Sequence, residues 1–548
     1  MMSFAVFFLL GLMLLVPTSA TDEPWVRDIK NKMATINADN CHVQPDLSLR
    51  PRPFDMLKQD RFKRMSLAVL NRAFFFSYIL QKLNQTFYDF QSLPNLDYYY
   101  LSASTAVASV PQALASGVYY DKNTMYPNFD RALYFNQTYP LFGVRSVRTD
   151  LQNAFDLMSI ADSGNYTTRA AKKYTPWYWI YLPDPKGDYF NQQFYTVAKT
   201  KATGETELTA IRAPLSDNGF DFTMPYFDCG RTNKWITTAV SPITDVLPRY
   251  TGYAYLRRSR TVAVAAMDIE FDLNQIDAGT ERPKVSIADQ FSDQMKGMFV
   301  NHLRNVNPGN CGSLPDHNLT IHERVFEGRN EVFPHQLRTA ERLANFISGI
   351  LRTRSLGLES AAGDVFPIDK QQILGEVIAA VMADDLIVRT GIYFERDEAG
   401  LLATEYFAPV AWRERDQYGV DQFKVKDMAE EMNLAGGHNY TEEDTFQLYK
   451  NGAPKKFSFE HILTGAAATG SYRSRSLDPG MSKEGMIYPA VAPDTGTQGN
   501  VYFDCGGLGE WLWNYTVPFA RLLNLNERTQ TFAGLVTVTI RLSPDDFI

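Results

Sequence analysis

Two copies of one short motif contain the residue types most suited to chemistry in this chain. The first copy is Tyr226-Phe227-Asp228-Cys229-Gly230, and the motif returns as Tyr502-Phe503-Asp504-Cys505-Gly506. The cysteine of each copy could form a disulfide or bind a metal ion. In both copies a tryptophan lies six residues after the cysteine, and a proline lies seven residues after that tryptophan. This agreement in register indicates a tandem duplication.

The chain has four cysteines, an even number that suits an oxidising compartment. They are Cys41, Cys229, Cys311 and Cys505, and their spacing repeats, because 229 − 41 = 188 and 505 − 311 = 194. Of the three possible connectivities, the duplication favours Cys41–Cys229 with Cys311–Cys505, one bridge in each repeat. Pairing between repeats and four free thiols are the alternatives. A zinc site is disfavoured because there is no Cys-x-x-Cys pair.

Other catalytic patterns are missing from the sequence. It contains no Gly-x-Ser-x-Gly, no phosphate-binding Walker loop and no dinucleotide fingerprint. None of the seven histidines lies near the duplicated motif, so acid–base catalysis has few candidate residues. His317 and His322 have the wrong spacing for a helical zinc pair and are expected in an exposed loop. We therefore expect no enzymatic activity, no cofactor and no metal site.

The composition is that of an acidic globular protein with room for two or more domains, at 548 residues and a net charge of −8. No basic stripe offsets phosphate charge, so nucleic acid is not an expected partner. An apolar run from Phe4 to Val16, followed by small residues up to Ala20, is typical of a cleaved signal peptide and too short to span a bilayer. The mature protein is therefore expected to be secreted and not membrane-spanning, with a retained anchor as the alternative.

Glycosylation sequons support the same extracellular localisation. In a secretory pathway, Asn-x-Ser/Thr sites on the surface would carry glycans. Asn165 and Asn439 occupy matching places in the two repeats. The six sequons are Asn84, Asn136, Asn165, Asn318, Asn439 and Asn514.

Hydrophobic periodicity predicts the same order of elements in both repeats: three helices, a hairpin, an irregular connector and a three-stranded antiparallel meander. We place a signal peptide at residues 1–20 and the two repeats at 21–280 and 281–548. The helices are expected at Val26–Ile36, Phe54–Leu83 and Ser102–Leu114, and at Phe291–Val306, Phe333–Leu351 and Lys370–Met382. The hairpin strands are expected at Gly117–Asp121 and Ala132–Phe135, and at Gly391–Glu395 and Leu401–Phe407.

One group of motifs resembles a known family. The chain has Pro176-Trp177-Tyr178 after the hairpin, Tyr226-Phe227-Asp228 entering the third strand, a strand from Trp235 to Pro242, and a strand ending Met267-Asp268-Ile269. This pattern is similar to extracellular Cache domains, as in calcium-channel alpha-two-delta subunits and bacterial chemoreceptors. The resemblance covers about Gly117–Asp277 well and Gly391–Ile548 more weakly. It implies an α+β fold of two tandem repeats, each a helical stalk plus a five-stranded antiparallel PAS-like sheet.

The resemblance also implies a ligand site in the first repeat. In amino-acid-binding Cache domains an Arg before Trp-Tyr holds the ligand carboxylate, while aromatic rings and the Asp of Tyr-x-Asp hold its amine. The matching residues here are Trp177, Tyr178, Tyr226 and Asp228. The arginine is missing, because Tyr174 and Thr175 occupy its place. Arg169, Lys172 or Lys173 could substitute for it, although none has the family's spacing.

A structural interpretation stands beside the ligand site: Trp177 and Tyr178 would pack on the sheet, and Asp228 would cap a turn next to a disulfide. The second repeat has Asn451-Gly452-Ala453 about where Pro-Trp-Tyr should fall, and is expected to be structural. The first functional hypothesis is thus a secreted sensory protein that binds a small amine or amino acid in repeat 1. The alternative is an extracellular glycoprotein that uses Cache folds as a scaffold for protein partners.

Overall fold

The structure is a computed structural model of the 548-residue chain. It describes residues 24–43, 60–85, 96–122, 124, 141–148, 155–159, 165–169, 172, 174–182, 196–200, 206–210, 219–229, 232–246, 259–271, 304–307, 309–310, 318–319, 333–355, 370–396, 406–415, 421–429, 439–452, 486–487, 496–505, 508–524 and 529–542. The predictions that lie outside them concern the signal peptide, the boundary at 280/281, Asn136, Lys173, Cys311, His317, His322, the strand Ala132–Phe135 and all but the last three residues of the helix Phe291–Val306.

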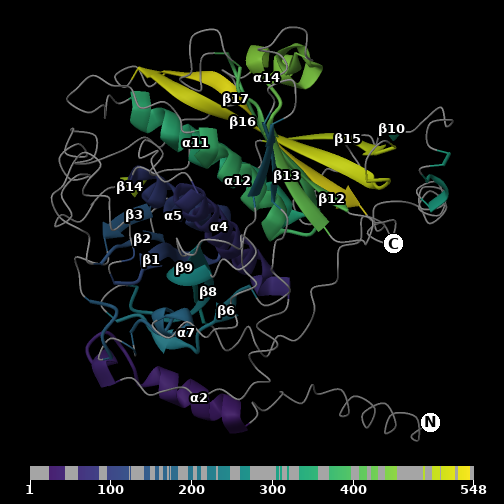
Figure 1. The fold of residues 1–548 in the computed structure, drawn as a ribbon. Helices are drawn as coiled ribbons and strands as arrows, with labels where there is room; N and C mark the ends of the chain where they lie inside the picture. The colour runs from purple at the N-terminus through teal and green to yellow at the C-terminus, as the bar shows by residue number, and fades with distance from the viewer. Residues whose placement is uncertain are drawn as a thin grey trace, which may run out of the picture.

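Two antiparallel sheets contain the described strands, and each repeat supplies most of one sheet (Figure 1). Sheet A has the order β14-β3-β2-β1-β9-β8-β6, with β7 also paired to β8, and sheet B has the order β10-β15-β16-β17-β11-β12-β13-β5-β4. The strands of sheet A are β1 Ala113–Tyr120, β2 Gly143–Arg148, β3 Phe155–Ser159, β6 Asp221–Phe222, β7 Tyr226–Phe227, β8 Trp235–Val246, β9 Ser259–Glu270 and β14 Met486–Ile487. Those of sheet B are β4 Thr196–Thr200, β5 Thr206–Ala210, β10 Asn318–Leu319, β11 Ile387–Phe394, β12 Pro409–Arg415, β13 Asp421–Asp427, β15 Thr497–Phe503, β16 Trp511–Asn524 and β17 Thr529–Leu542.

Both sheets contain the same core of five strands. The order β2-β1-β9-β8-β7 in sheet A is repeated as β12-β11-β17-β16-β15 in sheet B. The predicted two-repeat, antiparallel α+β layout is therefore confirmed. The sheets are larger than the five strands predicted, because strands at their edges extend them to eight and nine. The second hairpin strand of repeat 2 also begins later than predicted, at Pro409.

The edge strands are exchanged between the repeats. The β4–β5 hairpin, from the connector of repeat 1, pairs through β5 with β13 of sheet B. In return β14, from the connector of repeat 2, pairs with β3 of sheet A. The sequence contained no signal for this exchange, since an edge strand can accept any neighbour of suitable register. Each sheet is thus completed by the other repeat.

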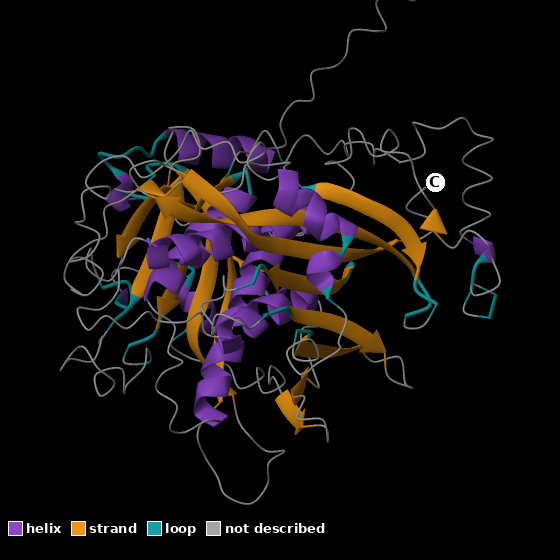
Figure 2. Ribbon diagram, turned by 90° about the horizontal axis from the view of Figure 1, so that it is seen from above, coloured by secondary structure: helices purple, strands orange, loops and turns teal. Residues whose placement is uncertain are grey.

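The long helices lie between the two sheets and do not form a stalk (Figures 1 and 2). On sheet A lie α4 (Asp60–Gln85) and α5 (Leu96–Ser109), and on sheet B lie α11 (Pro334–Ser355) and α12 (Lys370–Ala383). Across the middle, α4 packs on α12 and α5 packs on α11, so one hydrophobic core contains side chains of both repeats. The stalk prediction is wrong because α4 is buried on every side from Val69 to Leu80, as a helix in a core is, whereas a stalk helix would expose part of its surface.

The third helix of repeat 1 is shortened before Leu114, as expected from Pro111 within its predicted range. It stops at Ser109, two residues before Pro111, and the next strand begins at Ala113. Proline cannot continue a helix, and it disfavours helical backbone in the residue before it. The remaining helical elements are α2 Pro24–Ala34, η1 Cys41–Val43, α7 Tyr178–Tyr181, η10 Tyr440–Glu442 and α14 Asp444–Gly452. No helix among the described residues is both long enough and apolar enough to cross a membrane.

Matching side chains perform the same task in both repeats. Ser77 of α4 and Ser348 of α11 accept hydrogen bonds from backbone amides of β8 and β16, at 2.9 and 3.2 Å. Arg148 donates to the carbonyls of Val107 and Val110 at the end of α5, and Arg413 donates to the carbonyls at the end of α12. Cations at a helix C-terminus satisfy carbonyls that lack helical partners. The duplication therefore extends to individual side-chain contacts.

A cavity of mixed polar and apolar lining lies between the helices of the two repeats. Its volume is about 30 Å³, enough for about two water molecules. Asn71 of α4 lines it together with Thr339 and Arg342 of α11. The Asn71 side chain is 3% exposed, and neither its Oδ1 nor its Nδ2 has a hydrogen-bond partner among the described residues.

We expect Asn71→Leu to raise the free energy of unfolding by about 1 kcal/mol, because leucine fills similar space and removes two unsatisfied buried polar atoms. Urea denaturation of the two proteins measures the difference. Ser348→Ala is a control that should lower stability, since it removes a hydroxyl with a backbone partner. A less stable Asn71→Leu protein would contradict the prediction and indicate that ordered water satisfies the amide.

Candidate functional site

The candidate site lies on the outer face of sheet A, the face turned away from the helices. Side chains of a strand alternate between faces, so Val118 and Tyr120 point into the shared core while Tyr119 points outward. A separate aromatic cluster covers this outer face. Its members include Tyr119, Tyr166, Trp177, Tyr178, Tyr181 and Tyr226. The short helix α7 lies over the sheet at this point (Figure 1).

The structure brings together all four site residues predicted from the sequence on this face. Trp177 is 2% exposed and stacks on Tyr119, with ring centroids 3.9 Å apart. The Tyr178 hydroxyl donates to Asp121 Oδ1 at 2.5 Å. The Tyr226 hydroxyl lies 2.9 Å from Thr238 Oγ1. These contacts give each ring a fixed place in the aromatic cluster.

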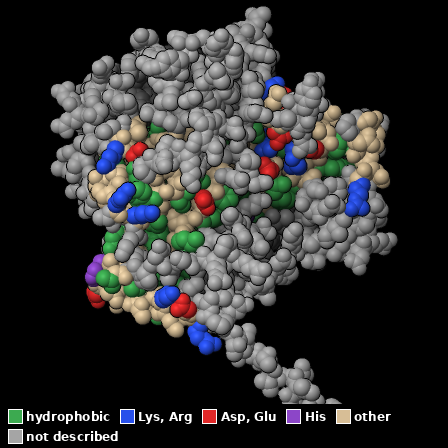
Figure 3. Space-filling view, turned by 60° about the horizontal axis from the view of Figure 1, so that its bottom comes forward, with side chains coloured by type: hydrophobic (Ala, Val, Ile, Leu, Met, Phe, Trp, Pro, Cys, Tyr) green, Lys and Arg blue, Asp and Glu red, His purple; other side chains and the backbone are tan. Residues whose placement is uncertain are grey.

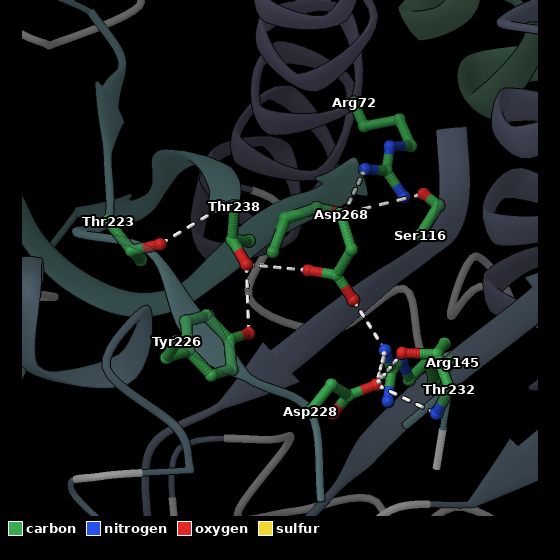
Figure 4. Close-up of polar contacts among 10 residues, drawn as sticks. Arg72, Ser116, Arg145, Thr223, Tyr226, Asp228, Thr232, Thr238 and Asp268 are labelled. Carbon is green, nitrogen blue, oxygen red and sulfur yellow. Dashed lines mark hydrogen bonds and ion pairs between the residues drawn. The ribbon is translucent and has the colours of Figure 1, made fainter. Parts of the chain in front are cut away.

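The fourth predicted residue, Asp228, belongs to a buried charged triad (Figure 4). Its Oδ2 accepts from Arg145 Nη2 at 2.9 Å, and the same Nη2 donates to Asp268 Oδ2 at 2.6 Å. The other oxygen of Asp268 accepts from Thr238 Oγ1 at 2.6 Å. A continuous row of polar contacts therefore runs from Tyr226 through Thr238 and Asp268 to Arg145 and Asp228.

The triad is fully removed from solvent. Arg145 is 1% exposed, Asp228 is 2% exposed and Asp268 is 3% exposed. Burial by itself lowers the pKa of Arg145, but the adjacent Asp228 and Asp268 carboxylates raise that pKa well above its ordinary value. Burial raises the pKa of Asp268 despite the attraction of Arg145. Two carboxylates and one guanidinium leave this buried group with an excess of negative charge.

Arg145 retains unused hydrogen-bonding capacity. Its two ion pairs both use Nη2, while the buried Nε and Nη1 have no partner among the described residues. A guanidinium has five N–H donors, and leaving buried donors unpaired is costly. The open donors are therefore the strongest indication of a ligand on this face.

A second arginine supports the same strands from the helix side. Arg72 of α4 donates from Nη2 to the Ala266 carbonyl at 2.7 Å and from Nη1 to the Gly117 carbonyl at 3.4 Å. Gly117 is in register with both Ala266 on β9 and Arg145 on β2. Burial lowers the pKa of Arg72 to about 9. Arg72 thus holds the part of the sheet that carries the triad.

Repeat 2 has the same turn but lacks the triad. Gly391 is in register with Val410, as Gly117 is with Arg145, and each glycine lies under the ring of the tyrosine two residues later. At the position of Asp268 repeat 2 has Thr539, whose hydroxyl donates to Asn514 at 2.8 Å. The fold unit therefore forms without buried ions at this place.

The turn role predicted for Asp228 is also present. The Asp228 carboxylate accepts from the backbone amide of Thr232 at 3.2 Å, and Asp504 accepts from Leu508 in the same way at 2.8 Å. The Asp228 and Asp504 amides donate to Lys234 and Glu510 at 3.0 Å. The turn contact is common to both repeats, whereas the ion pair with arginine is specific to repeat 1.

The structure contains the predicted disulfide between Cys41 and Cys229, with Cα atoms 5.7 Å apart. Cys505 is also disulfide-bonded, while Cys311, its predicted partner, lies outside the described residues.

Among the described residues no group of histidine, cysteine and acidic side chains could hold a metal ion. On the face seen in Figure 3, acidic and basic side chains are interspersed in small groups.

The two matching sequons are built alike. Asn165 Oδ1 accepts from the Thr167 amide and hydroxyl at 3.0 and 2.6 Å, and Asn439 accepts from Thr441 at 3.2 and 2.7 Å. The intervening Tyr166 and Tyr440 each donate to two backbone carbonyls of the hairpin strands. Of the other sequons, Asn84 lies near the end of α4, Asn318 in β10 and Asn514 in the interior of β16.

The sequence analysis missed the arginine of the site. Arg169 and Lys172 are exposed, and neither is part of the triad. The cation comes instead from Arg145, 32 positions before Trp177, on β2, a strand that was not predicted from the sequence. Val144-Arg145-Ser146-Val147-Arg148 puts its two arginines on opposite faces of β2. Arg145 could have been recognised from the sequence because arginine is rarely placed in a buried strand unless it has a charged partner.

Comparisons with known proteins identify no family. No family model matches the chain, and no curated protein matches it. Among solved structures, the extracellular domain of a candidate histidine kinase is 13% identical, with 70% of this chain and 97% of that chain covered and a TM-score of 0.20. A TM-score this low carries no conclusion about fold or function.

Proposed function

We propose that repeat 1 binds a small molecule with a carboxylate and an amine, such as an amino acid, on the outer face of sheet A. The observation that supports this proposal most directly is Arg145, a buried guanidinium whose Nε and Nη1 have no partner among the described residues. It lies between two carboxylates and next to the aromatic cluster. A ligand with complementary charges would use all of these groups.

Each part of such a ligand has a chemically suitable partner. The carboxylate would accept from the open donors of Arg145. The amine would approach Asp228 and Asp268, which carry the excess negative charge, and the rings of Tyr119 and Tyr226 would favour a cation. Trp177 would close the site against water. Because these side chains are buried, the segment that carries Trp177 must move to admit the ligand.

The broader role proposed is that of a secreted sensory or binding protein with two Cache-like repeats. The five-strand core present in both sheets supports this interpretation, as does the place of the aromatic site opposite the helices. The Cys41–Cys229 disulfide suits an oxidising compartment. Asn165 is exposed and could carry a glycan, and repeat 2 would be structural.

A second candidate function is an extracellular scaffold for protein partners. The closed state of the site favours it, because Trp177, Tyr226 and the triad are all at most 5% exposed and Arg145 is already paired with two carboxylates. In that case the triad would only join β2, β9 and the Asp228 turn.

Thermal unfolding of the mature protein with a panel of amino acids and short amines distinguishes the two functions. A ligand present at about one hundred times its dissociation constant should add about 2.7 kcal/mol of stability. We expect the shift to vanish in the double variant Arg145→Val/Asp268→Thr, which installs the residues of repeat 2. If no compound raises the melting temperature, the scaffold function is favoured. A shift that persists in the double variant would place the ligand elsewhere.

A further inference from the structure

We propose that the N-terminal clasp, defined as residues 24–43, holds both walls of the repeat 1 site in position. The positioning residues are Cys41 of the clasp and its contacts Cys229 and Tyr174 in the two walls. This inference rests on the proposed function, because the two walls form a binding site only if repeat 1 binds a ligand. The clasp comprises α2, an asparagine-rich turn and η1. In Figure 1 it lies on the same side of sheet A as α7.

The first wall is the turn that carries Asp228. Cys229 directly follows Asp228 and is bonded to Cys41, which is 1% exposed. At the other end of this turn, Trp235 Nε1 donates to the Met33 carbonyl of α2 at 3.1 Å. The clasp therefore contacts the Asp228 turn at both of its ends, through the disulfide at Cys229 and the hydrogen bond from Trp235.

The second wall is the cap segment, defined as residues 174–182, which carries Trp177 and Tyr178. At its start the Tyr174 hydroxyl donates to the His42 carbonyl at 3.2 Å. His42 directly follows Cys41 within η1. One three-residue turn thus contacts both the Asp228 wall and the aromatic wall, although the two walls are separated in sequence by about fifty residues.

The clasp is rigid enough to act as a support. Asn40 accepts from the Asn37 amide at 2.8 Å and donates to the Thr35 carbonyl at 2.8 Å, which fixes the turn before Cys41. Met33 and Ile36 pack against the shared core. Because the ligand can enter only when the cap segment separates from the sheet, a support fixed to both walls favours the closed state.

Repeat 2 provides a matched control. Its turn at 305–310 has the same asparagine contacts, with Asn310 accepting from Asn307 at 2.8 Å and donating to Asn305 at 2.7 Å. Cys505 is disulfide-bonded like Cys229, and Tyr449 of α14 donates to the Thr516 carbonyl at 3.1 Å. At the positions of Arg145 and Asp268 repeat 2 has Val410 and Thr539, so its disulfide and Tyr449 are not next to a triad of this kind.

Hydrogen exchange of the full chain tests the clasp without a ligand. The readout is the exchange rate of the Tyr178, Trp179 and Leu182 amides, which donate within the cap segment. We expect exchange about five-fold faster in Tyr174→Phe, for the loss of one hydrogen bond, and on the order of tenfold or more in Cys41→Ser/Cys229→Ser. Tyr449→Phe and Cys311→Ser/Cys505→Ser should leave these amides unchanged. Equal rates in wild type and Tyr174→Phe would overturn the inference, even if the disulfide variant fails to fold.

A second arm adds a mixture of L-amino acids and short amines. In the wild type the mixture should slow exchange of the cap segment, and this protection should fall in Tyr174→Phe but persist in Tyr449→Phe. If the wild type gains no protection, the proposed function fails, while the arm without the mixture still decides whether the clasp holds the cap. Equal protection in Tyr174→Phe and the wild type would overturn the clasp's role in binding.

Discussion

Replacement of Arg145 by valine is expected to lower the free energy of unfolding by about 3–5 kcal/mol. The substitution leaves the carboxylates of Asp228 and Asp268 buried at 2% and 3% exposure without their shared cation. Breaking a buried ion pair by removing one partner costs this much because the remaining charge cannot regain its hydration. Urea or guanidinium denaturation at neutral pH measures the loss.

The sequence of repeat 2 suggests a second substitution that should restore the stability lost in Arg145→Val. Arg145→Val/Asp268→Thr reproduces Val410 and Thr539 of repeat 2, where the corresponding strands pair without an arginine or an aspartate at these two positions. We expect this double variant to regain most of the lost stability. If the double variant is no more stable than Arg145→Val, the excess carboxylate charge is not the cause of the loss.

Alkaline pH is expected to unfold the protein cooperatively above about pH 10. Burial raises the pKa of Tyr166, Tyr226 and Tyr440 well above the ordinary value for tyrosine. Above about pH 10 the unfolded chain releases these protons while the folded chain keeps them, so stability falls as the pH rises. Arg72 acts in the opposite direction, because its pKa of about 9 means that the folded chain loses that proton first.

The sum of these contributions predicts a steep alkaline transition. Three tyrosines contribute about 4 kcal/mol per pH unit and Arg72 offsets about 1.4, which leaves a net loss of about 3 kcal/mol per pH unit. Absorbance of tyrosinate near 295 nm, recorded together with circular dichroism, should show these tyrosines ionising only as the fold is lost. Gradual ionisation near pH 10 with the fold intact would contradict the prediction.

The sequence by itself was sufficient for the duplication, the order of elements and the Cys41–Cys229 pairing. These features follow from local patterns: hydrophobic periodicity marks helices and strands, and two copies of one motif in register show the repeat. Trp177, Tyr178, Tyr226 and Asp228 were predicted as ligand-binding residues from the family resemblance, and that role stays a prediction.

Only the tertiary structure decided how the two repeats join and where the cation of the site lies. The exchange of β5 and β14 depends on edge strands more than two hundred residues from their partners, and no local pattern encodes such a choice. Arg145 meets Asp268 because of the register of β2, β1 and β9, and Asp228 joins them because β7, which precedes it, pairs with β8. Periodicity determines which face of its own strand a residue occupies, but the neighbours on that face are set by long-range pairing, and here that pairing placed a buried arginine between two acids.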